Sequence, residues 1–450
     1  MTKLQTSLDT LESLIAAREP TLHALLPEPG RFERLRREAS ALEARYPDPV
    51  ARPPLFGALV AVKDIFHVDG FVTRAGSQLP ESLLQGPQAA SVTLLKNAGA
   101  LVLGKAVTTE FAFFGPGPTT NPRDPARTPG GSSSGSAAAV AAGYAPLALG
   151  TQTIGSILRP ASFCGVYGYK PSYERVSRAG VIPLARSYDH VGLLAADLGV
   201  LERGARALIP DWSLDPAAWG ASRPTLGIPE GPYLRRCGTD METRFRNAVI
   251  RLVRAGYTVR SVPMFPDFEV IRDRQYALTA FECAEVHKTW YDAQRSLYHP
   301  KTAELIERGR AVPASIADAA RDARSTLRDE IALVMKVQRI DAWLSPSAIG
   351  AATRGLESTG DPVMNLPWTQ AGLPVIGLPM DEDDEGMPLG LQLTGAFGAD
   401  EALLGWAARL RAGQPESRAG SSPGRRSTRS RASPPRWPKA RARHRCVGLS

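Results

Sequence analysis

Residues 128–143, TPGGSSSGSAAAVAAG, place a cluster of glycines and serines directly before a run of small apolar residues. Such a tract can be a flexible linker, a phosphate-binding loop or a set of hydroxyls used in chemistry. Gly130 and Gly135 have the spacing of the P-loop glycines, but Ser136 stands where that loop has its phosphate-binding lysine. The tract is therefore not a P-loop.

The same residues formally match the nucleophile elbow of α/β-hydrolases, Gly-x-Ser-x-Gly, with Ser133 at its centre. An elbow requires a strand immediately before it, and the preceding residues 121–129, NPRDPARTP, contain three prolines, which interrupt strand pairing. His190, directly after Asp189, is a poor candidate for the histidine that an elbow nucleophile needs. Both observations argue against an elbow.

Hydrophobic patterning predicts an α/β organisation around the tract. Residues 55–66, LFGALVAVKDIF, are typical of a strand that carries Lys63 near its end, and residues 136–143 of a helix. The N-terminal helical segment is expected to end near residues 27–30, and residues 146–181 are expected to be rich in loops. Further helices are expected within 89–100, 240–256, 267–295, 315–340 and 400–410, and further strands within 100–111, 223–231, 257–264, 341–350, 373–380 and 387–397.

Two residues outside the tract complete a possible catalytic set. Ser156 lies 24 residues after Ser132 in a second glycine-containing segment, TQTIGSILRP, and Lys63 ends the strand upstream. A serine hydroxyl is a weak nucleophile until a base removes its proton, and a buried lysine can act as that base when its amine is neutral.

These segments, together with PLALGTQTIGSILRPASFCGVYGYKPS and STGDPVMNLPWT, resemble the amidase signature family, and most closely its malonamidase-type members. The resemblance runs from about residue 50 to 410. It implies one large α/β domain at residues 1–412, with a mixed central β-sheet covered by helices and a core motif region at residues 50–195. It also implies hydrolysis of a small amide to a carboxylate and ammonia, without cofactor or metal.

The resemblance assigns roles to the three residues. Ser156 is expected to be the nucleophile, Lys63 the base, and Ser132 the group that passes protons between them and to the leaving amine. The peptide bond between Gly131 and Ser132 is expected to be cis. The oxyanion hole is expected to consist of backbone N–H groups of Thr153, Ile154, Gly155 and Ser156.

The sequence departs from the family pattern around Ser156. The family often places an aspartate four residues before the nucleophile and an arginine two residues after it, where this chain has Gln152 and Leu158. An arginine follows one residue later, as Arg159, and malonamidase-type members share this arrangement and use that arginine to bind the substrate carboxylate. We therefore expect Arg159 to bind a malonamate-like carboxylate, with bracing of the loop as the alternative. Ser133 is expected to supply a further hydroxyl to the substrate-binding region.

Two other departures affect the expected activity. Ile154 occupies a position that is normally glycine, and a β-branched residue would be disfavoured there if a positive φ is required. Glu174 stands where relatives commonly have glycine, so a tight turn is expected to be strained. A catalytically impaired amidase-fold binding protein is therefore one alternative function, and a glutamyl-tRNA amidotransferase A-type subunit is another.

Charge and cysteine usage limit the remaining functions. The net charge of +9 lies in residues 413–450, a basic segment rich in arginine, serine and proline that we expect to be disordered. A solvated tail without a role is favoured over a nucleic-acid-binding arm. The four cysteines are far apart and suggest neither disulfides nor a metal site. The absence of an apolar span and of a signal-peptide pattern leads us to expect a cytoplasmic protein without membrane contact, either alone or as a homodimer.

Overall fold

A ten-stranded mixed β-sheet organises the chain, with strand order β2-β1-β3-β5-β4-β9-β10-β8-β6-β7. The computed structural model describes residues 2–213, 215, 220 and 222–412. Contacts group these described residues into one compact unit. The basic segment expected to be disordered, 413–450, lies outside the described residues.

Three parallel strands at one end of the sheet position the lysine. β1 (Leu59–Lys63) lies between β2 (Leu101–Ala106) and β3 (Leu147–Gln152), and both neighbours run parallel to it. All of β2 and β3 and most of β1 are buried, which fits their nearly continuous apolar sequences. Lys63 is the last residue of β1, at the carboxyl edge where loops carry functional groups.

The remaining strands extend the sheet from β3. β5 (His190–Ala195) pairs antiparallel with β3 and with β4 (Tyr167–Lys170), and β4 pairs antiparallel with β9 (Val375–Glu382). β10 (Pro388–Gly395) lies antiparallel to β9 and to β8 (Ala342–Pro346). β6 (Leu226–Glu230) runs parallel to β8 and to the edge strand β7 (Val259–Pro263). The sheet is thus parallel at both ends and antiparallel in the middle.

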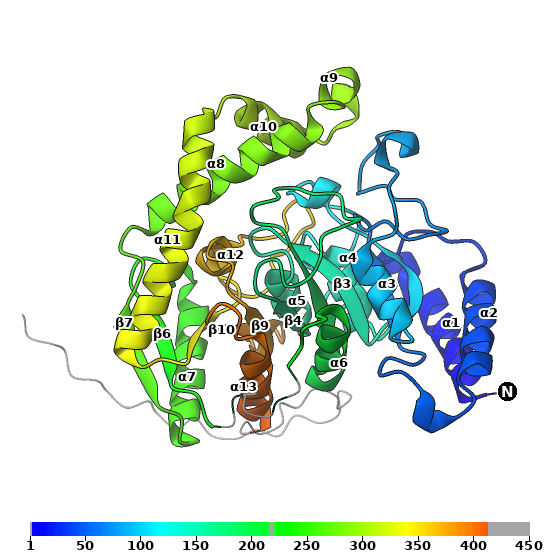
Figure 1. Ribbon diagram of the computed structural model, residues 1–450, viewed down its shortest axis with the longest axis horizontal. Coiled ribbons are helices and arrows are strands. Elements are labelled where there is room, and N and C mark those ends of the chain that lie inside the picture. The colour runs from blue at the N-terminus through cyan, green and yellow to red at the C-terminus, as the bar shows by residue number, and fades with distance from the viewer. Residues whose placement is uncertain (1, 214, 216–219, 221, 413–450) are drawn as a thin grey trace, which may run out of the picture. The chain divides into compact units, whose positions relative to one another are not determined.

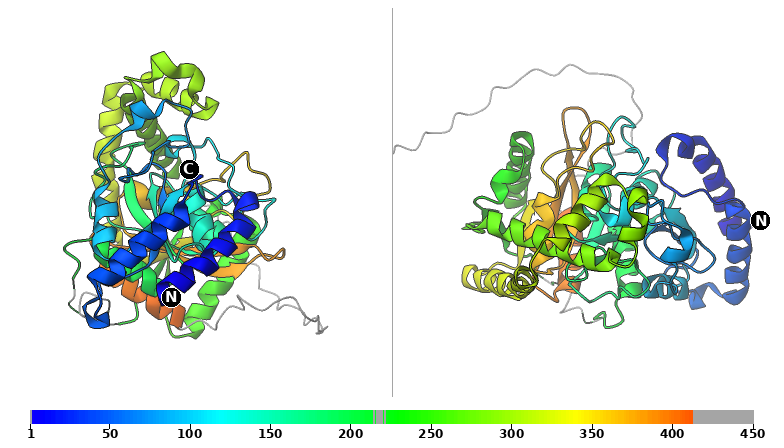
Figure 2. Two further views of the ribbon diagram at one scale, coloured as in Figure 1. Left: turned by 90° about the vertical axis from the view of Figure 1, so that its right-hand side faces the viewer. Right: turned by 90° about the horizontal axis from the view of Figure 1, so that it is seen from above.

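Helices cover this sheet, and α8 to α11 extend beyond it at one side (Figure 1). The N-terminal helices α1 and α2 lie side by side next to the β2 end of the sheet (Figure 2). The helices are α1 (Lys3–Leu22), α2 (Arg31–Arg45), α3 (Ala90–Asn97), α4 (Ser134–Ala141), α5 (Leu158–Cys164), α6 (Leu198–Leu208), α7 (Thr239–Arg254), α8 (Phe268–His287), α9 (Tyr291–Gln294), α10 (Pro300–Arg310), α11 (Ala314–Gln338), α12 (Leu366–Gln370) and α13 (Asp400–Ala412).

The small residues of the Gly/Ser tract are explained by the packing of α4. This helix is buried from Ser134 to Val140 and lies against β1, β2, β3 and β5. A Cβ atom on Gly135 would lie 2.2 Å from the carbonyl oxygen of Ala24 and 2.4 Å from the nitrogen of Val107, closer than any side chain tolerates. The glycines and alanines therefore let the Gly/Ser tract approach the sheet closely.

The sequence predictions and the structure differ at several places. The helix expected over 267–295 is divided into α8 and α9, and α6, α10 and β5 were not predicted. The N-terminal segment forms two helices, because the first ends at Leu22 and a second occupies residues 31–45. The helix expected to start at residue 136 starts at Ser134. The segment 146–181, expected to be rich in loops, contains β3, α5 and β4, short elements whose many glycines hide their pattern. In the described part of the chain, no helix has the length and apolarity needed to cross a bilayer.

The turn at Glu174 has the strain expected from the sequence. Glu174 has a φ of 67°, in the left-handed region that glycine adopts most readily. Its exposed side chain forms an ion pair of 3.1 Å with Arg178. This surface pair does not compensate for the backbone conformation, since exposed pairs contribute little.

We predict that Glu174→Gly stabilises the protein. Removal of the side chain relieves the left-handed conformation, and after the entropic cost of glycine a gain of about 0.5–1 kcal/mol in the free energy of unfolding remains. Urea denaturation measures the change. Glu174→Ala is the matched control, because it removes the same ion pair and keeps a Cβ, and it should give no gain. Equal effects of the two variants would contradict the account.

Candidate active site

Lys63 is a fully buried amine whose side-chain hydrogen bonds go to hydroxyl groups. Its exposed fraction is 0%, and Nζ donates to Ser132 Oγ at 2.7 Å and to Thr151 Oγ1 at 2.8 Å. Within the described residues no carboxylate forms an ion pair with it. Burial lowers the pKa of Lys63 well below its usual value, and the charge of Asp189 partly opposes this effect. A lysine in this environment can hold a neutral amine and accept a proton.

Ser132 is held by the segment that connects residues 121–129 to α4. The peptide bond between Gly131 and Ser132 is cis, as the resemblance implied. The carbonyl oxygen of Ser132 accepts hydrogen bonds from Thr109 N at 3.2 Å and from Thr108 Oγ1 at 3.3 Å. These contacts fix the main chain of Ser132 while its hydroxyl faces Lys63.

Ser156 lies in the loop 153–157 between β3 and α5 and lines the same pocket as Ser132. Its carbonyl oxygen accepts from Ser133 N at 3.3 Å, so the two serine segments are joined by their main chains. The N–H groups of Ile154, Gly155 and Ser156 donate to no other group in the described part of the chain. This leaves them available to a ligand in the pocket.

Ile154 is compatible with this loop. It has no positive φ, so the strain considered from the sequence is not present. Its carbonyl oxygen accepts from Thr369 Oγ1 at 2.7 Å, and its buried side chain packs in the main core and lines the pocket. A β-branched residue at this position therefore narrows the pocket without distorting the loop backbone.

Gln152 and Ser133 support the loop from behind. Gln152 Oε1 accepts from Ile157 N at 2.9 Å and from Leu158 N at 3.0 Å, which satisfies N–H groups at the start of α5. The Oγ of Ser133 lies 3.3 Å from both the nitrogen and the carbonyl oxygen of Thr151. Ser133 does not line the pocket with Ser132 and Ser156, so the structure places it among the supporting residues rather than against a substrate.

Arg159 is a buried cation that lines the pocket and is only half satisfied. Its exposed fraction is 2%, and Nη2 donates to Gly131 O at 2.6 Å and to Thr359 Oγ1 at 3.1 Å. Nε and Nη1 have no hydrogen-bond partner among the described residues. Burial lowers the pKa of Arg159 to about 10, so it remains charged at neutral pH. A charged, buried group with free donors has the chemistry to bind an anion.

The pocket around these groups is small and partly aromatic. Its volume is only about 20 Å³, far below the roughly 300–1,000 Å³ of ligand sites in proteins. Phe113 and Phe114 form one wall, and the Arg159 guanidinium lies 5.9 Å from the centre of the Phe114 ring. The preceding residues Phe111 and Ala112 both have positive φ, 46° and 61°. This strained turn is the local feature that carries the two aromatic rings to the pocket.

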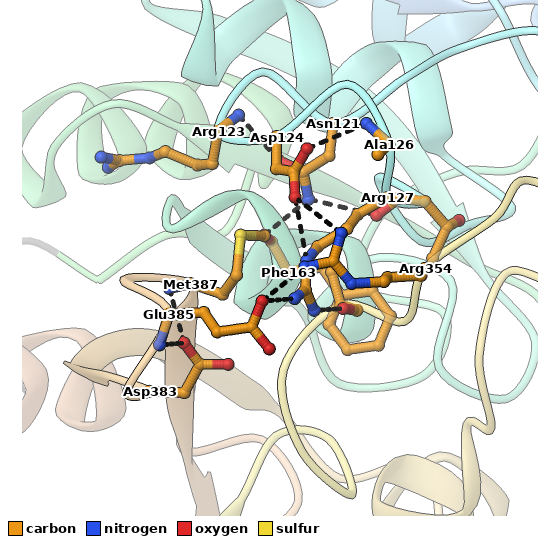
Figure 3. Close-up of polar contacts among 12 residues, drawn as sticks. Asn121, Arg123, Asp124, Ala126, Arg127, Phe163, Arg354, Asp383, Glu385 and Met387 are labelled. Carbon is orange, nitrogen blue, oxygen red and sulfur yellow. Dashed lines mark hydrogen bonds and ion pairs between the residues drawn. The ribbon is translucent and has the colours of Figure 1, made fainter.

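A second group of charges fixes the segment that leads to Ser132 (Figure 3). Arg127 is buried and pairs with Asp124 at 3.1 Å and with Glu385 at 2.6 Å, and its Nη1 donates to Ala352 O at 2.7 Å. Arg354 reaches the same Glu385 at 2.6 Å from the solvent side. These contacts join residues 121–128 to residues 352–354 and to the turn between β9 and β10.

The joined segments both continue into the pocket. Residues 128–132 lead to Ser132, while residues 353–362 lead to Thr359, the partner of Arg159, and to Pro362 in the pocket wall. A Cβ atom on Gly131 would lie 2.8 Å from Thr359 Cγ2, so the two segments touch directly at this glycine. The Arg127 cluster therefore sets the spacing between the serine and arginine sides of the pocket.

The structure thus brings together Lys63, Ser132, Ser156, the 153–156 loop and Arg159. Sequence reasoning missed the polar groups Thr151 and Asp189 and the wall residues Phe113, Phe114 and Pro362. Thr151 precedes the Ser156 loop on β3, and Asp189 directly precedes β5, so the sheet order brings both to the site. The available signal was the position of each polar residue: Thr151 lies on the buried strand β3, and Asp189 directly precedes the buried strand β5. No cluster of three or more His, Cys, Asp or Glu suited to a metal occurs in residues 2–213, 215, 220 and 222–412.

Comparison with known proteins shows the family to which the chain belongs. A family model described as Amidase matches residues 15–404. AtzE of Pseudomonas sp. (strain ADP), which belongs to a 1-carboxybiuret hydrolase, is 35% identical over 392 residues, which cover 81% of this chain and 85% of that protein. The A-type subunit of the glutamyl-tRNA(Gln) amidotransferase of Synechococcus sp. (strain RCC307) is 32% identical over 448 residues, covering 87% and 90% of the two chains.

A solved structure gives the same result for the fold. It is described as a vestigial protein complex that reveals the origins of an s-triazine catabolic enzyme. Its chain superimposes with a TM-score of 0.82 at 29% identity, over 91% of this chain and 95% of that chain. The α/β architecture with a large mixed sheet is therefore shared with amidase-type proteins.

We predict that Arg127→Met destabilises the protein far more than Arg354→Met. The first change leaves the buried carbonyl of Ala352 without its donor, which costs about 1–3 kcal/mol in the free energy of unfolding. Arg354 is exposed and shares Glu385 with Arg127, so its loss should change stability little. Urea denaturation of both variants measures the difference. Equal destabilisation would show that the cluster is an ordinary surface ion-pair network.

Proposed function

Because the chain belongs to the amidase family, whose members hydrolyse the C–N bonds of amides, we propose that it cleaves a small, carboxylate-bearing, malonamate-like amide through a Ser156 acyl-enzyme. The observation that carries the substrate class is Arg159, a buried cation with two unpartnered N–H groups in the wall of the serine pocket. A neutral substrate could accept hydrogen bonds from these donors but would leave the buried positive charge without a counter-ion.

The first step acylates Ser156. Neutral Lys63 takes the proton of Ser132, Ser132 takes the proton of Ser156, and Ser156 Oγ bonds to the amide carbonyl carbon. The proton then returns through Ser132 to the amide nitrogen, the C–N bond breaks, and ammonia leaves. The 2.7 Å contact between Lys63 Nζ and Ser132 Oγ supports this relay.

Water completes the cycle. It attacks the acyl carbon with Lys63 and Ser132 again accepting its proton, and Ser156 leaves as the hydroxyl while the carboxylate product forms. The N–H groups of Ile154, Gly155 and Ser156, together with that of Thr153, would bind the oxyanion in both steps, a contribution of about 3 kcal/mol for each well-placed donor.

The relatives support a carboxylate-bearing substrate and also a partner. AtzE is named as part of a hydrolase of 1-carboxybiuret, a substrate that carries a carboxyl group on a urea-like nitrogen. The likeness to the A-type component of the amidotransferase favours a second candidate, supply of ammonia within a complex that acts on tRNA. Co-purification with partner proteins would favour that candidate, and ammonia release by the isolated chain or homodimer favours hydrolysis of a small amide.

We predict that Ser156→Ala abolishes hydrolysis. Removal of the nucleophile should lower kcat by about 10⁴-fold or more, as in other serine hydrolases. Ammonia release from malonamate, neutral aliphatic amides and aryl amides measures the activity, and the unfolding curve serves as the control for folding. Activity retained within tenfold of the unchanged protein would exclude Ser156 as the nucleophile.

We predict that Arg159→Met changes substrate preference. Malonamate carries a carboxylate where malonamide carries a neutral amide of the same size. Loss of a charged hydrogen-bonded pair costs about 1.5–3 kcal/mol. We therefore expect kcat/KM for malonamate to fall about 10- to 100-fold relative to kcat/KM for malonamide. Loss of the Arg159 contact to Gly131 affects both substrates and cancels in the ratio.

Arg308→Met is the matched control for the arginine. Arg308 is exposed in the outer pocket that shares Phe113, Phe114 and Pro362 with the serine pocket. This variant removes a positive charge near the entrance and should leave the malonamate-to-malonamide ratio within threefold of its original value. Equal losses on both substrates in the Arg159 variant would contradict the carboxylate site and leave Arg159 as a loop brace.

A further inference from the structure

Asp189 is a buried carboxylate beside the catalytic residues that the reaction scheme does not use. It directly precedes β5, and its exposed fraction is 8%. Its oxygens accept from Thr153 Oγ1 at 2.6 Å, from Leu184 N at 2.9 Å and from Ala185 N at 3.1 and 3.2 Å. Among the described residues no Lys, Arg or His forms an ion pair with it. A buried anion without a paired cation is costly and calls for an explanation.

Its hydrogen bonds join two parts of the pocket. Thr153 is the first residue of the loop that would bind the oxyanion, and Leu184 lines the serine pocket. Because a short hydrogen bond to a fixed carboxylate restricts the Thr153 side chain, it also restricts the peptide groups that follow. Gln275 Nε2 donates to Thr153 O at 2.8 Å and completes the restraint. Asp189 therefore restricts the orientation of the 153–156 loop.

The charge of Asp189 also acts on Lys63, the proposed base. The Asp189 carboxylate opposes the effect of burial on the pKa of Lys63. The two residues share surroundings, since Asp189 and the Lys63 partner Thr151 line one cavity of about 260 Å³. In the proposed reaction Lys63 carries an extra proton between its removal from Ser156 and its delivery to the leaving amine. A nearby anion stabilises that protonated state.

We propose that Asp189 is a positioning residue for the reaction: it aligns the Thr153–Ser156 loop and favours protonated Lys63 during proton transfer. This inference rests on the proposed function, since it needs Ser156 as nucleophile and Lys63 as base. It assigns to Asp189 no contact with substrate.

The groups that face Asp189 come from four elements. Lys63 ends β1, Cys283 lies on α8, His190 begins β5, and Arg178 lies in the loop before Asp189. Burial raises the pKa of Asp189 to about 6, while Thr153 and the two backbone N–H groups oppose this rise. Asp189 is therefore charged above about pH 6 and loses its charge below it. The base function of Lys63 requires the neutral amine, whose fraction increases with pH.

The test is the pH dependence of Ser156 modification by a fluorophosphonate, followed by intact-protein mass spectrometry. In this reaction a bond forms between Ser156 Oγ and phosphorus, the P–F bond breaks, fluoride leaves, and the serine proton passes through Ser132 to Lys63. The rate rises with pH as Lys63 becomes neutral. The measurement uses the full chain and needs no knowledge of the natural amide.

Three variants separate the two roles. Asp189→Asn removes the charge, so the rise should move to lower pH and the maximal rate should fall about tenfold or more. Thr153→Val removes only the hydroxyl tie, so the maximal rate should fall while the midpoint of the rise stays. Glu282→Gln is the matched control: Glu282 is a second carboxylate that holds the same 184–189 segment, through Ser187 N at 2.8 Å and Ser187 Oγ at 2.6 Å. Glu282→Gln should leave the midpoint unchanged.

The outcomes separate the role of Asp189 from the proposed function on which it depends. Labelling of the unchanged protein at Ser156, with the same midpoint and maximal rate in Asp189→Asn, overturns the role of Asp189 alone. An equal shift in Glu282→Gln overturns it too, because the effect would then follow from loop support. Failure of the unchanged protein to label at Ser156 at any pH overturns both the role of Asp189 and the proposed function.

Discussion

The burial of Lys63 without an acidic hydrogen-bond partner is the constraint on which the site depends. An amine taken out of water at the end of a buried strand must either pair with an acid or lose its proton. In this protein its hydrogen bonds go to Ser132 and Thr151, both hydroxyls that tolerate either protonation state. The close approach of the Gly/Ser tract to the sheet makes the first of these contacts, and β3 makes the second. The sheet order and the packing of α4 thus place the two hydroxyl partners of Lys63.

Two other buried cations near Lys63 show why its environment is specific. Lys105, on the neighbouring strand, pairs with Asp64 at 2.7 Å, so its charge is compensated inside the protein. Arg159 cannot lose its proton at ordinary pH and keeps two donors unpartnered. The three cations therefore differ in how the cost of burial is met: Lys105 has an ion pair, burial lowers the pKa of Lys63, and Arg159 keeps two unpartnered donors. The last two features are the ones on which the proposed hydrolysis of an acidic amide rests.

Part of this site was predictable from the sequence, because its groups lie in segments with strong local signals. The strand ending in Lys63, the small-residue helix after Ser132 and the loop with Ser156 all follow from patterning and from the family resemblance. Glu174 was also predicted correctly as a strained turn, since glycine is usual there. The subgroup of the family and the substrate did not follow in the same way, because they depend on where the free donors of Arg159 point.

Other features depend on contacts between distant segments and could not be read from a single sequence. The loss of the usual aspartate at Gln152 suggested only a missing charge, yet its amide satisfies two N–H groups at the start of α5. The strain considered at Ile154 is absent because the loop needs no positive φ there. Asp189 reaches Thr153 only because β5 lies beside β3 in the sheet. Phe113 and Phe114 reach the pocket through a turn in which Phe111 and Ala112 have positive φ. Because neither residue is glycine, this turn could not be recognised in the sequence.

The most direct test of the central claim is the capture of the acyl-enzyme itself. Rapid acid quenching of the protein with malonamate, followed by peptide mass spectrometry, should find the malonyl mass on the peptide that contains Ser156, and the adduct should disappear as ammonia release ends. Hydrolysis of malonamate with no adduct at any quench time, or with the adduct on a different residue, would contradict a relay that runs from Lys63 through Ser132 to Ser156.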